Sequence, residues 1–385
     1  MKNVFLYSSS AFHNAHKHMI ANVPGGFQYQ KLDFMAVPTS SNPRLKSMLA
    51  KTASFLSPYY NYLHVVLGKP KVRTFYQMNC DIIHSAQCLL KTSVPYVVDF
   101  EHAAVFSGYN QVAYSNPSFL RNLIKILENR KLKRLLAWSN AAKMSLLNFV
   151  DSEEVARKTE VLYPVVTPPD KLTKKDDGTI KFLFVGGVFF EKGGLETLAA
   201  FDKISSKYDV ELVLVSNVPE EIKRKYSGNP KIKIYGTLPY SEVQKLYEYS
   251  HIFVMPTHFD TFGFVIPEAL SYGLPVISDN SFSRPELISH DKTGLLVDAY
   301  YSSFGKKGEY IYPTNSELVR KRKEACMNPP QFYINSIAVS MERMINDCEF
   351  RRKCSTNAIK ETTEGKFSPK VWKEKMKRIY SESMQ

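Results

Sequence analysis

One stretch, residues 256–298, constrains the fold most strongly, because a loop, a helix and a strand follow one another in it directly after a strand. The apolar run at 251–255 is typical of a strand and stops at a proline. A helix is expected over 265–272, with a proline confined to its first turn and a glycine after its last residue. A second apolar strand follows at 274–278. Strands and helices that alternate in this way predict a parallel sheet covered by helices.

The loop before this helix carries groups that suit a phosphate. Asp260 lies in it, and Glu268 follows in the first helical turn. Backbone N–H groups at a helix start lack intrahelical partners and carry a partial positive charge. Here they belong to Thr261, Phe262, Gly263 and Phe264. Spacing alone also allows an ordinary strand-helix-strand unit, in which Asp260 and Glu268 are only a loop acid and a helix N-terminal acid.

Two acids eight positions apart, Asp260 and Glu268, bracket the aromatic-glycine pair at 262–263. This pattern resembles the donor-site signature of retaining glycosyltransferases of family 4, the glycogen-synthase-like group. Further segments of the same signature follow in family order, at 273–276, 285–286 and 293–297. The first acid is usually Glu in the family, so Asp260 keeps the charge and loses one methylene of reach.

The resemblance implies an α/β protein with the GT-B fold, in which two Rossmann-like domains with parallel sheets face each other across a cleft and a C-terminal helix crosses back to the N-terminal domain. A chain of 385 residues is also longer than one typical domain. The proline-rich and charged segment at 168–179 predicts a linker. We therefore expect an acceptor-binding domain at 1–167, a donor-binding domain at 180–364 and the returning helix at 365–385.

A glycine-rich turn at 187–194 lies between an expected strand at 180–186 and a helix. Such a turn lets the backbone approach a phosphate, and Lys192 adds a mobile cation. In the family the turn contacts the donor diphosphate, which assigns Gly186, Gly187 and Lys192 to the donor site. Lys192 matches the family lysine, whereas Gly187 stands where the family has an arginine. Either the helix N-terminus and Lys192 suffice, or another base such as Arg284 substitutes.

Two further loops gain a role only from the resemblance. The loop of Gly236, Thr237 and Leu238 resembles the one that lies against the nucleotide base. Glu101 and His102 directly follow an expected strand at 95–100, at the carboxyl end where such sheets bind ligands. The family often places a histidine of this loop beside the transferred sugar, which points to His102. The alternative is a surface pair that orients the loop.

The positive charge lies mostly in the first half of the chain. The formal net charge is +14, and residues 1–170 carry 19 Lys and Arg against 10 Asp and Glu. A basic, aromatic stretch at 44–72 and an amphipathic helix expected over 118–136 could touch anionic lipid, although solvated basic faces explain both. The basic face of that helix comprises Arg121, Lys125, Arg130, Lys131, Lys133 and Arg134. Nucleic acid is not expected as a partner, since no motif accompanies the charge.

The expected location is the cytoplasm, or the cytoplasmic face of a membrane if the basic domain binds lipid. No apolar run approaches the roughly 20 residues that cross a bilayer, and the N-terminus reads as a strand rather than a signal peptide. Five cysteines, an odd number without Cys-x-x-Cys spacing, are typical of reduced thiols.

The resemblance implies a retaining hexosyltransferase that moves a sugar from a nucleotide-diphosphate-sugar to a glycan, glycolipid or lipid-linked acceptor. Lys192 would take up charge on the diphosphate and Glu268 would hold the ribose hydroxyls. Asp260 and His102 would position the transferred sugar. No metal and no cofactor are expected, and the sequence has no Asp-x-Asp tripeptide. A nucleotide-sugar epimerase on the same fold and a non-catalytic partner subunit remain alternatives.

Overall fold

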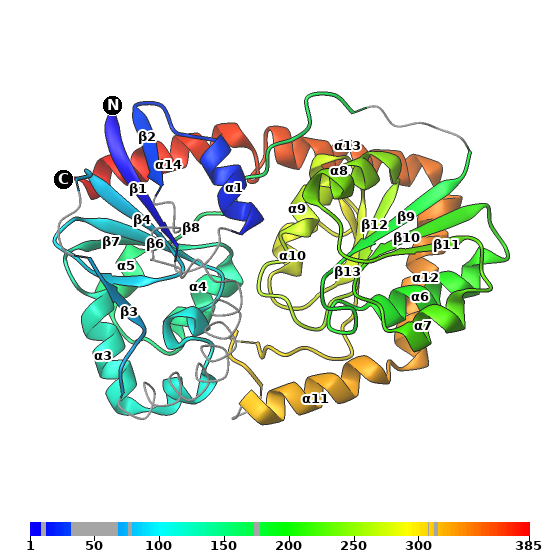
Figure 1. The fold of residues 1–385 in the computed structure, drawn as a ribbon, viewed down its shortest axis with the longest axis horizontal. Coiled ribbons are helices and arrows are strands. Elements are labelled where there is room, and N and C mark those ends of the chain that lie inside the picture. Colours follow the sequence, from blue (N-terminus) through cyan, green and yellow to red (C-terminus); the bar gives the residue numbers. More distant parts are fainter. Residues whose placement is uncertain (9–12, 32–67, 76–78, 173–177, 307, 312–314) are drawn as a thin grey trace, which may run out of the picture. The chain divides into compact units, whose positions relative to one another are not determined.

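The computed structural model describes residues 1–8, 13–31, 68–75, 79–172, 178–306, 308–311 and 315–385. The chain divides into two compact units (Figure 1). The first contains Met1–Tyr163 and the chain end Lys373–Gln385, and the second contains Pro164–Tyr312 and Ser316–Trp372. Residues 44–67 of the basic, aromatic stretch lie outside the described residues.

The first unit is built on a parallel sheet of six strands, in the order β2-β1-β4-β6-β7-β8. These strands are β1 (Lys2–Ser8), β2 (Phe27–Lys31), β4 (Ile82–Ala86), β6 (Tyr96–Phe100), β7 (Leu132–Ala137) and β8 (Thr159–Val161). A separate parallel pair is formed by β3 (Val72–Thr74) and β5 (Leu89–Lys91). Strands β4 and β6 are buried along their whole length, as expected of a parallel sheet that is covered on both faces.

Short helices surround this sheet. They are α1 (Asn14–Ala21), η2 (Ala103–Ser107), η3 (Gln111–Ser115), α3 (Pro117–Leu127), α4 (Asn140–Leu147) and α5 (Glu153–Lys158). Helix α3 buries Phe119, Leu123 and Leu127, which recur at helical spacing and join the core of the unit. The long C-terminal helix, α14 (Pro369–Ser383), packs on the same unit through Tyr380 and Glu382, which contact His84 and Arg134. The chain thus ends on the unit in which it begins.

The helix expected over 118–136 is wrong in its second half. Helix α3 ends at Leu127, a turn follows in which the Asn129 side chain accepts from the Lys131 N–H at 2.9 Å, and β7 begins at Leu132. The leucines of β7 extended the helical pattern because a buried strand and a buried helix face are both rich in leucine. The expected basic face is therefore divided between a helix, a turn and a strand, and Arg134 pairs with Glu160 and Glu382.

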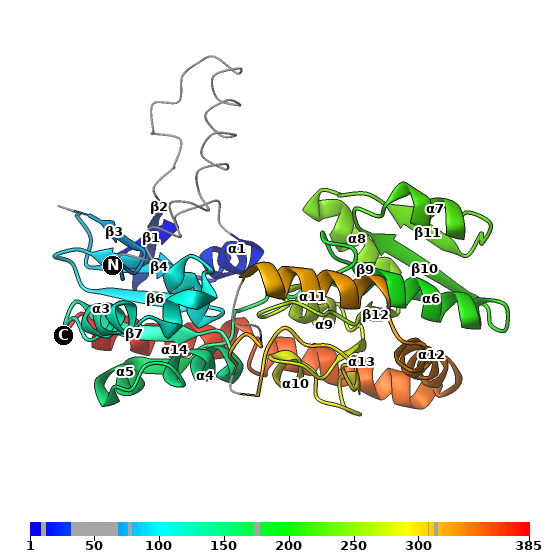
Figure 2. The ribbon, with the colours of Figure 1, turned by 90° about the horizontal axis from the view of Figure 1, so that it is seen from below.

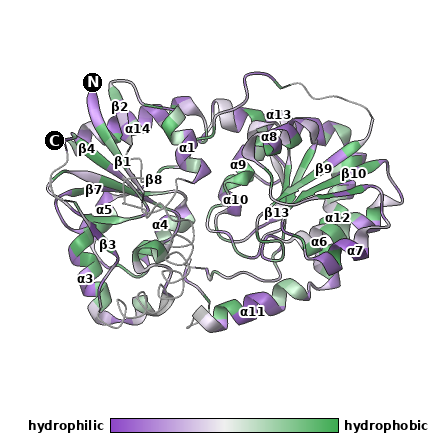
Figure 3. Ribbon diagram, in the orientation of Figure 1, coloured by the Kyte–Doolittle hydropathy of each residue, from purple (hydrophilic) through white to green (hydrophobic). Residues whose placement is uncertain are grey.

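The second unit has its own six-stranded parallel sheet, in the order β11-β10-β9-β12-β13-β14. The strands are β9 (Ile180–Val185), β10 (Val210–Val215), β11 (Ile232–Tyr235), β12 (Ile252–Met255), β13 (Val276–Asp279) and β14 (Gly294–Val297). Hydrophobic residues dominate these strands (Figure 3). The α/β class with parallel sheets in two Rossmann-like domains is therefore confirmed.

Several helices accompany this second sheet. They are α6 (Gly194–Ser205), α7 (Glu220–Tyr226), α8 (Tyr240–Tyr249), α9 (Val265–Ser271), α10 (Arg284–Leu287), α11 (Asn315–Met327), α12 (Gln331–Asn346) and α13 (Cys348–Thr363). Helix α12 packs against α6, and α13 packs against α9 (Figure 2). None of the helices in the described ranges is both long enough and apolar enough to span a membrane.

The last helices of the second unit differ in polarity. Helix α11 is too polar to show an apolar stripe. Helices α12 and α13 follow it in the chain. They are separated at Asp347, whose carboxylate accepts from the Phe350 N–H at 2.9 Å and starts the second helix.

Both sheets reverse their strand order beside their first strand. In the first unit β2 lies on one side of β1 and β4 on the other, and in the second unit β10 and β12 flank β9. The carboxyl ends of strands beside such a reversal are where open α/β sheets bind ligands. Each unit therefore has one such position, and the predicted site residues cluster near both.

Candidate active site

In the second unit, the glycine-rich turn after β9 lies directly against the loop after β12. Gly193 has φ +79°, and a Cβ atom there would lie 2.1 Å from the Pro256 carbonyl oxygen. The His258 N–H also donates to the Glu191 carbonyl at 2.8 Å. A glycine is required at this position, because only glycine combines that backbone conformation with so close an approach.

Lys192 and Asp260, which the sequence assigned to one site, form an ion pair across these two loops. The Lys192 ammonium lies 2.6 Å from Asp260 Oδ2 and donates to the Phe259 carbonyl at 2.9 Å. Their side chains are 20% and 16% exposed, so a ligand can reach both. Burial would raise the pKa of Asp260, but the Lys192 charge, helped by Arg284, holds that pKa below its ordinary value. Asp260 is thus an ionised carboxylate beside a cation.

Arg284 is fully buried and supports the loop that contains Asp260. Its guanidinium donates to the Asp260 carbonyl, to Asp279 Oδ1 at 3.1 Å and to Ser281 Oγ at 2.6 Å. These partners belong to the loop after β12, to the last residue of β13 and to the loop that follows it. The structure therefore gives no support to the alternative in which Arg284 replaces the arginine missing at Gly187.

The remaining residues of the glycine-rich turn connect to the loop at 236–238. Gly186 packs so closely on Lys192 that an added Cβ would lie 2.9 Å from the lysine Cβ, whereas a Cβ on Gly187 would meet no atom within 4 Å. Asn217, after β10, donates to the Gly187 carbonyl at 3.3 Å and accepts from the Thr237 hydroxyl at 3.1 Å. Gly236, Thr237 and Leu238 thus belong to the same edge of the sheet. Asn217 has no sequence signal of its own.

Glu268 lies in the first turn of α9 and is only 2% exposed. Its Oε2 accepts from the Tyr247 hydroxyl at 3.4 Å. Burial raises the pKa of Tyr240, and the Glu268 carboxylate nearby raises that pKa further. A second tyrosine hydroxyl therefore lies beside this acid. Both tyrosines come from α8, and spacing along the sequence could not have associated them with Glu268.

The backbone donors predicted at the start of α9 are partly used within the protein. The Phe262 N–H donates to Asp260 Oδ1 at 3.3 Å, and the Phe262 ring stacks on Phe264 with 6.5 Å between centroids. Gly263 has φ +80°, which lets the chain turn into the helix. Thr261 is buried beside them. These residues shape the Asp260 loop.

A buried contact between a histidine and a carboxylate, which sequence reasoning missed, lies under the same loops. His258 Nε2 lies 2.5 Å from Glu196 Oε1, and both side chains are at most 1% exposed. The Tyr300 hydroxyl donates to the same Glu196 oxygen at 3.1 Å and approaches the Ala325 carbonyl at 2.8 Å. This network joins the start of α6 to the loop after β12, although its members are far apart in the sequence.

His102, the histidine predicted beside the transferred sugar, belongs to the first unit and is 2% exposed. Its Nδ1 accepts from the Ala104 N–H at 3.0 Å and so starts η2. Glu101, its neighbour, instead lines a cavity and accepts from the Tyr109 hydroxyl at 2.9 Å.

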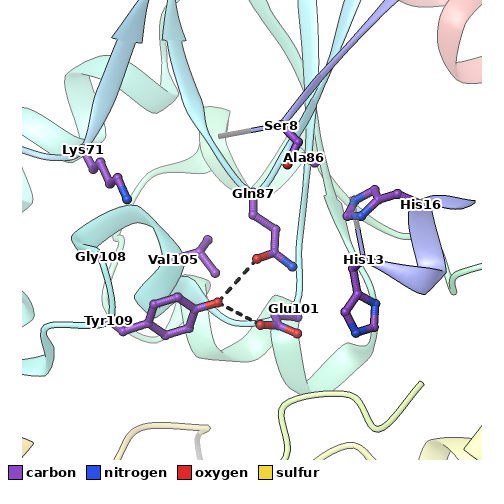
Figure 4. A pocket seen from close by; sticks show the side chains of 10 residues that line it. All are labelled: Ser8, His13, His16, Lys71, Ala86, Gln87, Glu101, Val105, Gly108 and Tyr109. Carbon is purple, nitrogen blue, oxygen red and sulfur yellow. Dashed lines mark hydrogen bonds between the residues drawn. The ribbon is translucent and has the colours of Figure 1, made fainter. Parts of the chain in front are cut away.

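This cavity has a volume of about 470 Å³ and lies at the carboxyl ends of β1, β4 and β6 (Figure 4). It is lined mainly by polar side chains. The lining residues are Ser8, His13, His16, Lys71, Ala86, Gln87, Glu101, Val105, Gly108 and Tyr109. Gln87 and Tyr109 have φ of 55° and 64°, a strained backbone for residues other than glycine, and the Tyr109 hydroxyl approaches Gln87 Oε1 at 3.4 Å. Strain of this kind concentrates at functional sites.

Behind the cavity, a buried carboxylate holds two histidines. Asp99 Oδ2 lies 3.0 Å from His16 Nε2 and 3.1 Å from His84 Nε2, and His84 Nδ1 lies 2.7 Å from the Tyr380 hydroxyl. Burial would raise the pKa of Asp99, but His16 and then His84 outweigh it and hold that pKa well below its ordinary value. An ionised carboxylate only accepts, so both Nε2 atoms donate to it.

Among the residues that the structure describes, no group of three or more His, Cys, Asp and Glu side chains is arranged to hold a metal ion.

Parts of the sequence are similar to known proteins. Residues 170–311 match the family described as Glycosyl transferases group 1. An uncharacterized 41.2 kDa protein in the cps region of Klebsiella pneumoniae is 31% identical over 38% of this chain and 40% of its own length. The capsular polysaccharide biosynthesis glycosyltransferase CapM of Staphylococcus aureus is 25% identical over 51% and 45%. The chain thus spans less than half the length of these two relatives.

Solved structures match nearly the whole chain in fold. HepE of Anabaena, solved in complex with UDP, has a TM-score of 0.62 at 14% identity and covers 99% of this chain and 100% of its own. Sucrose-phosphate synthase from Thermosynechococcus elongatus has a TM-score of 0.60 at 16% identity and covers 99% and 98%. The chain therefore has the GT-B fold, and its residues 170–311 match the group 1 glycosyl transferases.

Proposed function

We propose that this protein is a retaining glycosyltransferase of the hexosyltransferase type, which transfers a sugar from a nucleotide-diphosphate-sugar to a glycan, glycolipid or lipid-linked acceptor without a metal ion. The observation that carries the proposal is the Lys192–Asp260 ion pair at the carboxyl ends of β9 and β12, within the segment that matches the group 1 glycosyl transferases. A cation for a diphosphate and a carboxylate for a sugar stand next to each other there.

The pair can bind a ligand without being broken. An ammonium has three N–H donors, and the contacts of Lys192 with Asp260 and the Phe259 carbonyl use two of them. The third suits a phosphate oxygen. The Asp260 carboxylate lies 2.6 Å from this ammonium and, being ionised, favours positive charge nearby.

This arrangement fits the charges that develop during transfer. The bond between the anomeric carbon and the diphosphate oxygen breaks, and its electron pair leaves with the diphosphate. The acceptor hydroxyl oxygen forms the new bond to the anomeric carbon, and its proton passes to the departing diphosphate. The transition state therefore gains negative charge on the diphosphate, beside Lys192, and positive character on the sugar, beside Asp260.

The other predicted residues complete the donor site. Glu268 would take the ribose hydroxyls, in competition with the tyrosine hydroxyls that now contact it. The loop at 236–238 would lie against the base, held to the diphosphate turn through Asn217. His102 would assist from the first unit in positioning the transferred sugar.

For the acceptor, we propose the cavity of the first unit. Glu101, Gln87 and His13 offer acceptors and donors of the kind that hold sugar hydroxyls, and Lys71 adds one cation for an acidic group. The excess of basic residues in the first half of the chain favours an acceptor at a cytoplasmic membrane surface, bound through peripheral contact with anionic lipid. The chain would then act in the cytoplasm or at that surface.

Calorimetric titration tests the donor half of this proposal. UDP, GDP, ADP and their common sugar conjugates are titrated into the wild type, into Glu268→Ala and into the control Glu220→Ala, which removes an exposed acid from the first turn of α7. We expect micromolar binding of one nucleotide series, weakened at least tenfold in Glu268→Ala and unchanged in the control. Absence of binding to the wild type would contradict the proposal and favour a non-catalytic partner subunit.

Product analysis separates the remaining alternative. With the nucleotide sugar that binds, the wild type should transfer sugar with retained anomeric configuration only when an acceptor is present. An isomerised donor in the absence of any acceptor would identify an epimerase, which the match to the glycosyl transferases does not favour.

A further inference from the structure

Arg322 connects the two loops of the donor site from a helix outside the segment that matches the family. It lies on α11, whereas the match ends at residue 311. Its Nε lies 3.0 Å from Glu191 Oε1, and its guanidinium carbon lies 4.0 Å from the centroid of the Phe259 ring. The Arg322 side chain is only 10% exposed, so both contacts are made in a partly dehydrated environment, where they are stronger than on an open surface.

The two partners of Arg322 are the sequence neighbours of the ion pair. Glu191 precedes Lys192, and Phe259 precedes Asp260. A shift of either neighbour moves the adjacent backbone and therefore changes where the ammonium and the carboxylate meet. Because the pair spans two loops, its 2.6 Å separation depends on how firmly those loops are held together.

A column of aromatic rings extends this connection. Phe259 stacks on Phe304 with centroids 5.6 Å apart and ring planes 8° apart, and Phe304 stacks on Phe282 at 4.2 Å. Phe282 has φ 49°, a left-handed backbone that is costly for a bulky residue and that the surrounding packing must stabilise. The loop after β13 thus also supports Phe259, and Arg322 caps the assembly with a charge.

We propose that Arg322 is a positioning residue of the donor site, which holds Glu191 and Phe259 so that Lys192 and Asp260 meet the diphosphate and the sugar in a fixed geometry. That this geometry serves a diphosphate and a sugar rests on the proposed glycosyltransferase function. Arginine suits this task because its planar guanidinium stacks on a ring while its N–H groups donate to a carboxylate. Lysine would keep the ion pair without the planar stacking, and methionine would keep only the packing.

The first test needs no ligand. Hydrogen exchange is followed by mass spectrometry in Arg322→Met, in Arg322→Lys and in Arg320→Met, a control that removes an exposed arginine paired with Glu324 on the same helix. In Arg322→Met we expect about tenfold faster exchange in peptides covering 188–194 and 258–264, no change in β10, and an intermediate effect in Arg322→Lys. Arg320→Met should match the wild type.

The second test uses the nucleotide sugar that binds the wild type. A positioning role predicts that kcat falls about tenfold in Arg322→Met while KM for the donor changes less than threefold, with partial recovery in Arg322→Lys. A merely structural role would instead accelerate exchange throughout the second unit and lower kcat only in proportion to the folded fraction. That result would overturn the proposal, as would wild-type exchange and turnover in Arg322→Met.

Two provisions keep the outcomes distinct. If Arg322→Met does not fold, Glu191→Gln takes its place, because it weakens the ion pair and retains the stacking on Phe259; unchanged exchange at 188–194 in that variant would then overturn the proposal. If no nucleotide binds the wild type, the proposed function fails, while the exchange experiment still decides whether Arg322 holds the two loops.

Discussion

The two units place different chemistry at the same topological position. In the second unit, the loops after β9 and β12 hold a paired cation and carboxylate, fixed by a buried arginine and by backbone contacts between the two loops. In the first unit, the crevice beside β1 contains a cavity of about 470 Å³ lined mainly by polar groups, two of them on a strained backbone. A fixed charge arrangement suits a diphosphate, which all donors of this kind share, whereas a roomy polar cavity suits an acceptor that differs from enzyme to enzyme.

The most severe disruption should come from the turn that brings the two donor loops together. Gly193→Ala combines a left-handed backbone with a collision against the Pro256 carbonyl, so it should cost about 3 kcal/mol of unfolding free energy or more. Gly187→Ala, in the same turn, meets no atom within 4 Å and should stay within about 0.5 kcal/mol of the wild type. Urea unfolding followed through the buried Trp372 of the second unit measures both. Equal midpoints would show that the turn does not depend on this approach.

The meeting of Lys192 and Asp260 was predictable because its signals are local. The glycine-rich turn with Lys192 and the loop with Asp260 each lie within ten residues of a strand end, and the parallel sheet follows from the alternation of strands and helices. Arg322, Asn217 and Tyr240 could not be found in this way, since their contacts join segments far apart in the sequence. Each lies on a helix or loop without any distinctive pattern.

The cavity of the first unit was less predictable for a second reason. The left-handed backbone at Gln87 and Tyr109 is imposed by packing, whereas a sequence announces such a conformation only when glycine or asparagine occupies the position. Glu101 and His102 were expected at this edge from the strand that precedes them. In the structure Glu101 lines the cavity, whereas His102 starts η2.

Removing the cation of the donor site should separate the functions of the two units. Lys192→Met deletes a partly buried charge and leaves Asp260 unpaired, so we expect the affinity for the bound nucleoside diphosphate to fall about 100-fold. Lys71→Met deletes a cation from the cavity of the first unit and should change this affinity less than threefold. Calorimetry with the same nucleotide compares the variants. Similar losses in both would mean that the cavity also takes part in donor binding.

Acid should affect the first unit through Asp99. The pKa of this carboxyl is depressed in the folded state, so between that pKa and its ordinary value of about 4 the unfolded chain binds more protons than the folded one. The stability that Asp99 contributes is therefore present above about pH 4 and is lost as the pH falls, by up to about 1.4 kcal/mol per pH unit. Asp99→Asn should be less stable at pH 7 and should show a shallower decline below pH 4.

Urea unfolding between pH 5 and 2.5 measures this decline. In a Trp372→Phe background the remaining tryptophan, Trp138, packs 5.5 Å from His16 and reports on the first unit. Asp151→Asn, a change of an exposed aspartate in the same unit, serves as the control. If Asp99→Asn and the wild type lose stability with equal slopes, the carboxylate between the two histidines does not set the acid limit of this unit.

The smallest expected effect is a gain in nucleotide affinity. It tests whether the donor site already has the positive charge that a diphosphate needs. Gly187 stands where the resembling family has an arginine, its backbone does not require glycine, and a side chain there meets open space. Gly187→Arg should therefore fold normally and tighten binding of the nucleoside diphosphate by up to about tenfold, whereas Gly187→Gln, of similar length and uncharged, should not. Calorimetry at two salt concentrations sharpens the comparison, because an added charge contact should weaken as the ionic strength rises. If the arginine does not tighten binding, then Lys192 and the start of α6 already neutralise the diphosphate. The glycine at 187 would then provide space without a loss of affinity.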